Sequence, residues 1–367
     1  MKKIYFCLLI ISVLAASPVL AAKKATTAKP AVWKALTPEG YTAITWAQAP
    51  GIASFFKAPK DNGATDYLTR IYLPQNQIDF IIAPAVPADP NTATPAQPAP
   101  PPVENINSVT PDIATFPNLL FTRLVAEGAK SITPAIKFLW DAPFFNMQTG
   151  SSELSMAVKY STGGTTTIAS GSRSASDMAK PRRMLVINNN TGKATIKDFD
   201  SNFFVDNKNG DQALEGFSPA VVKSDGPGGG ASRLFLGVSD DGKELVVYCS
   251  QLATVDEASS ELTLAGVSID HQLEADGGGS AACGYNLPGQ FFVEPIRTLP
   301  LLMGAETILL RGTVTLESIN VRGDPSTKKP IIAKLPKGTT VRVYEEKNGW
   351  YRIGDKQWIL KSLIKKI

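Results

Sequence analysis

A carboxylate, three glycines and a hydroxyl follow one another in the run Asp276-Gly277-Gly278-Gly279-Ser280. Consecutive glycines leave backbone N–H groups that no side chain shields. A turn of this kind can hold an anion against its amides while the neighbouring carboxylate acts beside it. A flexible glycine-rich loop without such a role is the other interpretation of a glycine triplet. The residues and elements around the turn must decide between the two.

One arginine and two further carboxyl groups could complete an active site at this turn. Arg233 begins a predicted strand, and a guanidinium pairs bidentately with phosphoryl oxygens. Asp276 with either Asp141 or Glu274 could form the carboxyl pair that protonates a leaving oxygen and activates water. The amides of the turn would hold the remaining anionic charge, and Ser280 could donate to a phosphate oxygen. Together these groups could bind an anionic substrate and carry out acid–base chemistry on it.

Each of these residues also has a purely structural interpretation. Arg233 could form an ion pair that only stabilises the fold, Asp276 could only shape its turn, and Ser280 could only cap the next element. Glu274 beside Asp276 would raise the pKa of one of the two carboxyl groups if both share a site. The positions of these side chains in the folded protein distinguish the catalytic roles from the structural ones.

Three residues outside the turn are candidate substrate contacts. Phe144 and Phe145 follow a predicted strand that ends in an acid, where they could line a pocket mouth or belong to the core, and Arg297 follows another predicted strand. His271 is the only histidine, so zinc sites built on several histidines are excluded, and we expect a structural or surface role for it. Clustered carboxylates could hold a divalent metal ion, although no ligand spacing requires one.

Alternating strands and a helix must position the glycine turn. The predicted elements, in order, are a strand over 232–238, a hairpin turn at 240–242, a strand over 243–249, a helix over 254–265 and a strand over 269–275. Thr254 and Glu257 form a capping box that opens the helix, and Gly266 ends it. A further helix is predicted over 119–128, and a loop over 161–173. We therefore expect an α+β fold, a mixed β-sheet with packed helices.

The Arg233 strand, the capped helix and the Asp276 turn, in this order, resemble the phosphodiester glycosidase family, the N-acetylglucosamine-1-phosphodiester alpha-N-acetylglucosaminidase-like proteins. The resemblance covers residues 32–305. It implies a hydrolase that acts on a glycan or sugar-phosphate substrate at Asp276, Arg233 and the turn. The stretch 216–219, Gly-Phe-Ser-Pro, echoes a Gly-Pro of that family.

Two departures from the family pattern bear on activity. The family's Asn-Gly-Gly-Phe-Phe corresponds to Asp141-Ala142-Pro143-Phe144-Phe145, and proline has no N–H to donate. The family's Asn-Leu before the aspartate corresponds to Glu274-Ala275. A non-catalytic wall-binding protein that keeps the fold is therefore the alternative function.

The end of the chain, residues 313–367, resembles a bacterial SH3-type domain. The resemblance rests on Asn320-Val321-Arg322, on Lys337-Gly338 and on Gly349-Trp350-Tyr351-Arg352. It implies a small all-β barrel that attaches a secreted enzyme to a cell-wall polymer or peptide. Trp350, Tyr351 and Trp358 could line a groove for that ligand, although a barrel this small needs some of them in its core.

The start of the chain predicts export. Residues 1–21, with two lysines before a short apolar run, have the pattern of a signal peptide. The composition of residues 22–31 predicts a disordered leader. A proline-rich stretch, 84–102, reads as a loop inserted within the large domain. We expect a secreted or periplasmic cell-envelope protein that has no membrane contact once the signal is removed.

Charge and cysteine content complete the sequence argument. The net charge of +4 is small for 367 residues, which argues against a nucleic-acid partner. Outside the signal peptide the chain has two cysteines, Cys249 and Cys283, close to the ends of predicted strands on either side of one helix. In an oxidising compartment they could form a disulfide, and two buried free thiols are the alternative.

Overall fold

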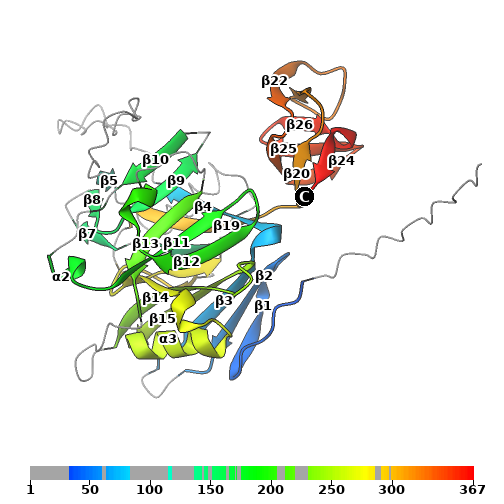
Figure 1. Ribbon diagram of the computed structural model, residues 1–367. Helices are drawn as coiled ribbons and strands as arrows, with labels where there is room; N and C mark the ends of the chain where they lie inside the picture. Colours follow the sequence, from blue (N-terminus) through cyan, green and yellow to red (C-terminus); the bar gives the residue numbers. More distant parts are fainter. Residues whose placement is uncertain are drawn as a thin grey trace, which may run out of the picture. The chain divides into compact units, whose positions relative to one another are not determined.

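The fold is seen in a computed structural model that describes residues 33–59, 63–82, 115–117, 136–142, 144–147, 151–162, 165–169, 171, 175–204, 211–219, 230–285, 291–296 and 299–367 (Figure 1). Residues 34–367 form one compact unit, to which the elements below belong. The predicted signal peptide and leader, the proline-rich loop, the helix over 119–128, Pro143 and Arg297 lie outside the described residues.

The largest element is an eleven-stranded antiparallel sheet, called the main sheet here. Nine strands follow the order β1-β2-β3-β15-β14-β16-β13-β11-β12, and β9 pairs with both β13 and β10. The bounds are β1 (Tyr41–Ala49), β2 (Ile52–Lys57), β3 (Asp66–Tyr72), β9 (Val158–Thr162), β10 (Thr165–Ala169), β11 (Arg182–Asn188), β12 (Lys193–Asp198), β13 (Gln212–Phe217), β14 (Ala231–Val238), β15 (Glu244–Ala253) and β16 (Gln272–Gly277).

A second sheet shares a hydrophobic core with the main sheet. Its order is β18-β17-β6-β19-β4. Leu234 and Leu236 of the main sheet and Phe138 and Met303 of the second sheet belong to the same buried cluster. The bounds are β4 (Asn76–Ile82), β6 (Ile136–Asp141), β17 (Cys283–Tyr285), β18 (Phe291–Val293) and β19 (Leu301–Thr307); a separate small sheet contains β5 (Thr115–Pro117), β7 (Phe145–Met147) and β8 (Ser151–Leu154).

The prediction of an α+β fold with packed helices is wrong, because antiparallel strands dominate the described residues. There, α3 (Val255–Leu264) is the only helix longer than one turn. The other helical pieces are α2 (Ala175–Met178), η1 (Leu73–Gln75), η2 (Ser201–Phe204), η3 (Ile269–His271) and η4 (Lys361–Leu363). The loop predicted over 161–173 overlaps two paired strands, β9 and β10, whose described residues are 158–162 and 165–169. In the described part of the chain, no helix is long and apolar enough to cross a membrane.

Helix α3 begins at the predicted capping box. The Glu257 N–H donates to the Thr254 hydroxyl, and the Glu257 carboxylate accepts from the Thr254 N–H. The chain after the helix packs Val267 against Gly237 of β14, where a Cβ would lie only 2.8 Å from the valine side chain. The local signal thus fixes one end of the helix, and close packing holds the following segment against the sheet.

Replacing Thr254 with alanine should lower the free energy of unfolding by about 1 kcal/mol, because the Glu257 N–H loses the hydroxyl that accepts its hydrogen bond. Urea unfolding followed by circular dichroism measures the change. Thr254→Ser keeps the hydroxyl and should unfold close to the parent. Equal losses for alanine and serine would show that the methyl group, and not the cap, stabilises this end.

The strands from residue 310 onward form two small sheets around a separate core. One sheet has the order β23-β20-β27 and the other β22-β21-β26-β25-β24. The bounds are β20 (Leu310–Val314), β21 (Ser318–Arg322), β22 (Ile331–Pro336), β23 (Thr340–Val343), β24 (Glu345–Lys347), β25 (Trp350–Gly354), β26 (Gln357–Leu360) and β27 (Ile364–Lys366).

A disulfide joins the main sheet to the second sheet. Cys249 on β15 and Cys283 on β17 are both buried, and their Cα atoms lie 6.5 Å apart. That separation is within the range that a disulfide spans. The link lies a few residues beyond the glycine turn, so it fixes the strand that the turn leads into.

Candidate functional site

The glycine turn carries the chain from the main sheet to the second sheet. It leaves β16 at Gly277 and enters β17 at Cys283. Gly278 has a φ of +78°, which strongly favours glycine, and its N–H donates to the Ser232 carbonyl at 2.8 Å. The Ser280 hydroxyl donates to the Gly277 carbonyl at 3.5 Å. The Gly278 amide is therefore engaged within the protein, and Ser280 takes part in closing the turn.

Arg233 and Glu274 meet beside this turn. The Arg233 Nη1 lies 2.7 Å from the Glu274 Oε1, and the Arg233 Nε donates to the Ala253 carbonyl at 3.3 Å. The side chains are 11% and 3% exposed, so water screens this ion pair little. A Cβ on Gly277 would lie 3.0 Å from the Arg233 Nη1. The glycine thus leaves room for the guanidinium to approach the turn.

A β-bulge directs Glu274 and Asp276 to opposite faces of the main sheet. Leu234 pairs with Asp276 and Phe235 pairs with Glu274, so Ala275 is the extra residue between them. Directly opposed residues of antiparallel strands share a face. Asp276 therefore lies on the face of Leu234, which belongs to the core between the sheets. Arg233 is opposite Gly277, on the other face.

Asp141 lies at the far end of the glycine turn. Its N–H donates to the Ala282 carbonyl at 2.9 Å, and its Oδ1 accepts from the Ala142 N–H at 2.8 Å. The residue is fully buried. The second sheet thus positions Asp141 next to the residues that leave the turn, while Arg233 and Glu274 lie next to the residues that enter it.

An aromatic pair borders the Arg233–Glu274 pair. The Phe144 ring centroid lies 5.2 Å from that of Phe217, and Phe217 is directly opposite Glu274 across β13 and β16. The Lys180 Nζ lies 4.5 Å from the Phe217 ring centroid. Phe145 packs against the core clusters instead. We did not select Phe217 or Lys180 from the sequence; the Gly-Phe-Ser-Pro run at 216–219 was the available signal for Phe217.

The three aromatic residues selected near the end of the chain are buried. Trp350, Tyr351 and Trp358 are 7%, 6% and 7% exposed, and Tyr351 belongs to the local hydrophobic core. Their largest contribution is to packing, since rings this covered present little area to a ligand.

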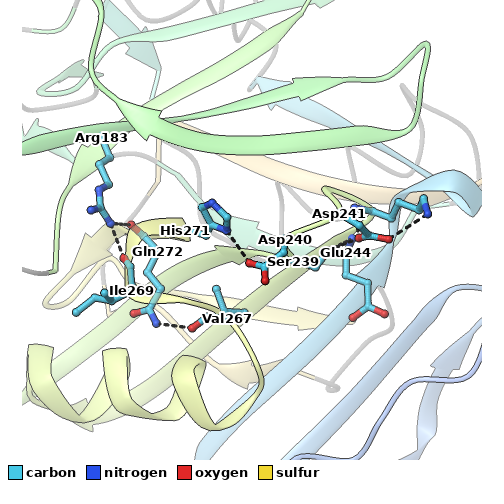
Figure 2. Close-up of polar contacts among 10 residues, drawn as sticks. Arg183, Ser239, Asp240, Asp241, Glu244, Val267, Ile269, His271 and Gln272 are labelled. Carbon is cyan, nitrogen blue, oxygen red and sulfur yellow. Dashed lines mark hydrogen bonds and ion pairs between the residues drawn. The ribbon is translucent and has the colours of Figure 1, made fainter.

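His271 lies on the surface, away from the glycine turn. Figure 2 shows its ring directed toward Asp240 in the β14–β15 hairpin turn, with 3.1 Å between Nδ1 and Oδ1. Arg183 donates to the Gln272 carbonyl in the same view. Within the described residues, no group of three or more His, Cys, Asp or Glu side chains could hold a metal ion.

Two known proteins show some similarity to this chain, one over a short segment and the other over most of its length. A Bacillus subtilis protein, provisionally named N-acetylmuramoyl-L-alanine amidase YrvJ, is 47% identical over 56 residues; the match covers 14% of this chain and 11% of that protein. The zebrafish N-acetylglucosamine-1-phosphodiester alpha-N-acetylglucosaminidase catalytic domain, auto-inhibited by its pro-peptide, matches 74% of this chain and 88% of that chain, with 14% identity and a TM-score of 0.42. That likeness is too weak to carry an argument.

The third comparison concerns the end of the chain. Residues 317–365 match the bacterial SH3 domain family. The matched residues include β21 to β26, which surround the separate core described above. Residues 317–365 therefore form a bacterial SH3 domain.

Proposed function

We propose that this chain is a cell-envelope hydrolase. Its large β domain cleaves the glycosidic bond of a sugar-1-phosphodiester, and its SH3 domain binds the envelope polymer in which that bond occurs. The observation that carries the proposal is the largely buried Arg233–Glu274 pair beside the glycine turn, with 2.7 Å between the charged atoms. A guanidinium fixed at a turn between two sheets can orient a phosphodiester anion.

The proposed roles follow from position. Arg233 binds a non-bridging phosphoryl oxygen, and Glu274 acts as a positioning residue that aims the guanidinium. Asp276 and Asp141, at the two ends of the turn, are the proposed catalytic carboxyl groups. Since Asp276 lies on the sheet face opposite Arg233, the proposal requires the sugar to bind across the turn from the phosphate. The bond between the anomeric carbon and the phosphoryl oxygen breaks, and water adds its oxygen to that carbon. One carboxylate accepts the water proton, and the phosphate leaves with the bonding electron pair.

Phe144 and Phe217 support a sugar as the group next to the phosphate. Aromatic side chains bring a large apolar surface to a binding site. The Lys180 ammonium, which contacts the Phe217 ring, adds positive charge on the same side. The proposed substrate thus has a sugar next to an anion, as a sugar-1-phosphodiester does. The remaining contacts proposed for substrate are Arg297 and the amides of Gly277 and Gly279.

The wall-binding half of the proposal rests on the SH3 domain. The B. subtilis relative carries the name of an amidase that acts on N-acetylmuramoyl-L-alanine bonds, which supports an envelope polymer as the target. Because that match covers about a tenth of the relative, it supports the location of the target rather than the reaction. The proposal includes secretion, as the predicted signal peptide implies.

Turnover of a panel of sugar-1-phosphodiesters tests the proposal, and Arg70 offers a matched control for Arg233. Arg70 lies on β3 of the same sheet, is also 11% exposed, contacts Glu244 at 2.8 Å and donates to the Ala265 carbonyl. Alanine at either position should lower the free energy of unfolding by about 3 kcal/mol. Only Arg233→Ala should lower kcat/KM, by about a hundredfold or more.

Three outcomes decide between the functions. A parent that releases sugar, with loss confined to Arg233→Ala and Asp276→Asn, supports the hydrolase. Equal losses of kcat/KM in Arg70→Ala and Arg233→Ala would mean that Arg233 only stabilises the fold. A parent that is inert with and without divalent ions, yet sediments with purified cell wall, would replace the hydrolase with a non-catalytic wall-binding protein.

A further inference from the structure

Positive charge is concentrated in the SH3 domain. Residues 317–367 contain twelve basic and five acidic residues, a net charge of +7, whereas residues 1–316 contain 25 basic and 28 acidic residues, a net charge of −3. Within the domain the strongest imbalance is in residues 322–337, which we call the basic hairpin. It has one acidic residue, Asp324, and five basic residues: Arg322, Lys328, Lys329, Lys334 and Lys337.

Two isoleucines are exposed in the middle of this basic hairpin. Ile331 and Ile332 begin β22 and are 47% and 52% exposed. β22 is the edge strand of its sheet. The register passes from Val321–Ala333 to Arg322–Ile331, so Ile332 is the extra residue of a bulge. Adjacent exposed isoleucines on a sheet edge promote association with other surfaces. This edge therefore has the character of a binding surface.

Of the four lysines near the isoleucines, two form ion pairs with acidic residues and two are exposed beside the isoleucines. Lys329 pairs with Asp324 at 3.1 Å, and Lys337 pairs with Glu317 at 3.0 Å. Lys328 and Lys334 are both exposed, one three residues before Ile331 and the other two residues after Ile332. The apolar pair is therefore flanked on both sides by ammonium groups.

We propose that the basic hairpin binds an anionic lipid surface. Ile331 and Ile332 enter the interfacial region of the bilayer, and Lys328 and Lys334 contact lipid phosphates. A water-soluble anionic polymer would satisfy the lysines but leave both isoleucines in water, whereas a bilayer accommodates charge and apolar surface together. The proposal departs from the sequence-based expectation of no membrane contact, and it does not depend on the hydrolase function.

The geometry of the hairpin suits a shallow interfacial contact. In Figure 1, β22 lies at the end of the SH3 domain away from β20, the strand through which the chain enters it. Each lysine near an anionic membrane contributes about 1 kcal/mol of attraction, which salt screens. The apolar contribution of the isoleucines does not depend on charge. Binding should therefore weaken with salt and also need both isoleucines.

Sedimentation of the full chain with vesicles tests the proposal. Vesicles of phosphatidylcholine mixed with phosphatidylglycerol should carry the protein down at low salt, and vesicles of phosphatidylcholine alone should not. The double change Ile331→Ser and Ile332→Ser should reduce partitioning by about tenfold or more. The double change Lys328→Gln and Lys334→Gln should have a similar effect. The control Lys347→Gln with Lys366→Gln removes the same charge elsewhere in the domain and should bind nearly as the parent does.

Several results would overturn the proposal. They are failure of the full chain to sediment with anionic vesicles, equal binding by the isoleucine variant, and equal weakening by the control. Charge-dependent sedimentation with purified peptidoglycan but not with vesicles would assign the hairpin to a wall polymer. Dimerisation in solution that the isoleucine variant abolishes would assign it to a second copy of the chain. Because Arg233→Ala leaves the hairpin intact, vesicle binding by that variant separates this proposal from the hydrolase proposal.

Discussion

Replacing Arg311 with alanine should lower the free energy of unfolding by about 3–5 kcal/mol, which would be among the largest effects of any single substitution here. Arg311 on β20 is 5% exposed. Its Nε donates to the Asn189 carbonyl at 2.6 Å, its Nη1 to the Pro74 carbonyl at 2.8 Å and its Nη2 to the Asn76 carbonyl at 2.7 Å. Alanine leaves all three carbonyl groups without these donors in a buried place.

Burial, together with the nearby Arg342, lowers the pKa of Arg311 to about 10, so the group stays charged at neutral pH. Arg311→Lys keeps the charge but cannot make three divergent hydrogen bonds, and it should lie between alanine and the parent. Arg352, whose ion pair with Glu345 is partly exposed, is the control; Arg352→Ala should change stability by less than about 1 kcal/mol. Equal urea midpoints for Arg311→Ala and Arg352→Ala would contradict the prediction.

Loss of the Cys249–Cys283 disulfide should lower the free energy of unfolding by about 3–4 kcal/mol. The bond closes a loop with a sequence separation of 34 residues, and the cross-link restricts the unfolded chain. The double change Cys249→Ala and Cys283→Ala removes the bond without leaving a free thiol. Urea unfolding of this variant and of the parent, each with and without dithiothreitol, measures the effect.

The disulfide prediction has its own internal control. Dithiothreitol during unfolding should lower the stability of the parent to near that of the double variant and leave the variant unchanged. Alkylation of the denatured, unreduced parent should modify neither cysteine. Modification of both, together with no effect of the reductant, would mean that the two residues are buried free thiols.

Features that depend on neighbouring residues could be predicted from the sequence. The capping box at Thr254 and Glu257 uses atoms three residues apart, so its pattern identified the start of α3. The hairpin turn predicted at 240–242 joins the paired strands β14 and β15 for the same reason. The SH3 domain has short strands between recognisable turns, and its motifs led to the family that residues 317–365 match.

Features that depend on distant pairing could not be predicted. The all-antiparallel order of the main sheet joins β3 to β15 across more than 170 residues, and no local pattern encodes that choice. The candidate site shows the same limit. Alternation along a strand places Glu274 and Asp276 on one face, and the bulge at Ala275 separates them. The sequence identified both carboxylates but not which one Arg233 meets.

The glycine turn is fastened at both ends, which restricts how its length can vary in evolution. The Gly278 N–H is bonded to the Ser232 carbonyl before the turn, and the disulfide at Cys283 holds the chain after it. An inserted residue could not loop out without disturbing the main sheet or the covalent link. Insertions and deletions among homologues should therefore be absent from the positions that correspond to residues 277–282. A homologue with a different spacing there should also lack one of the two cysteines.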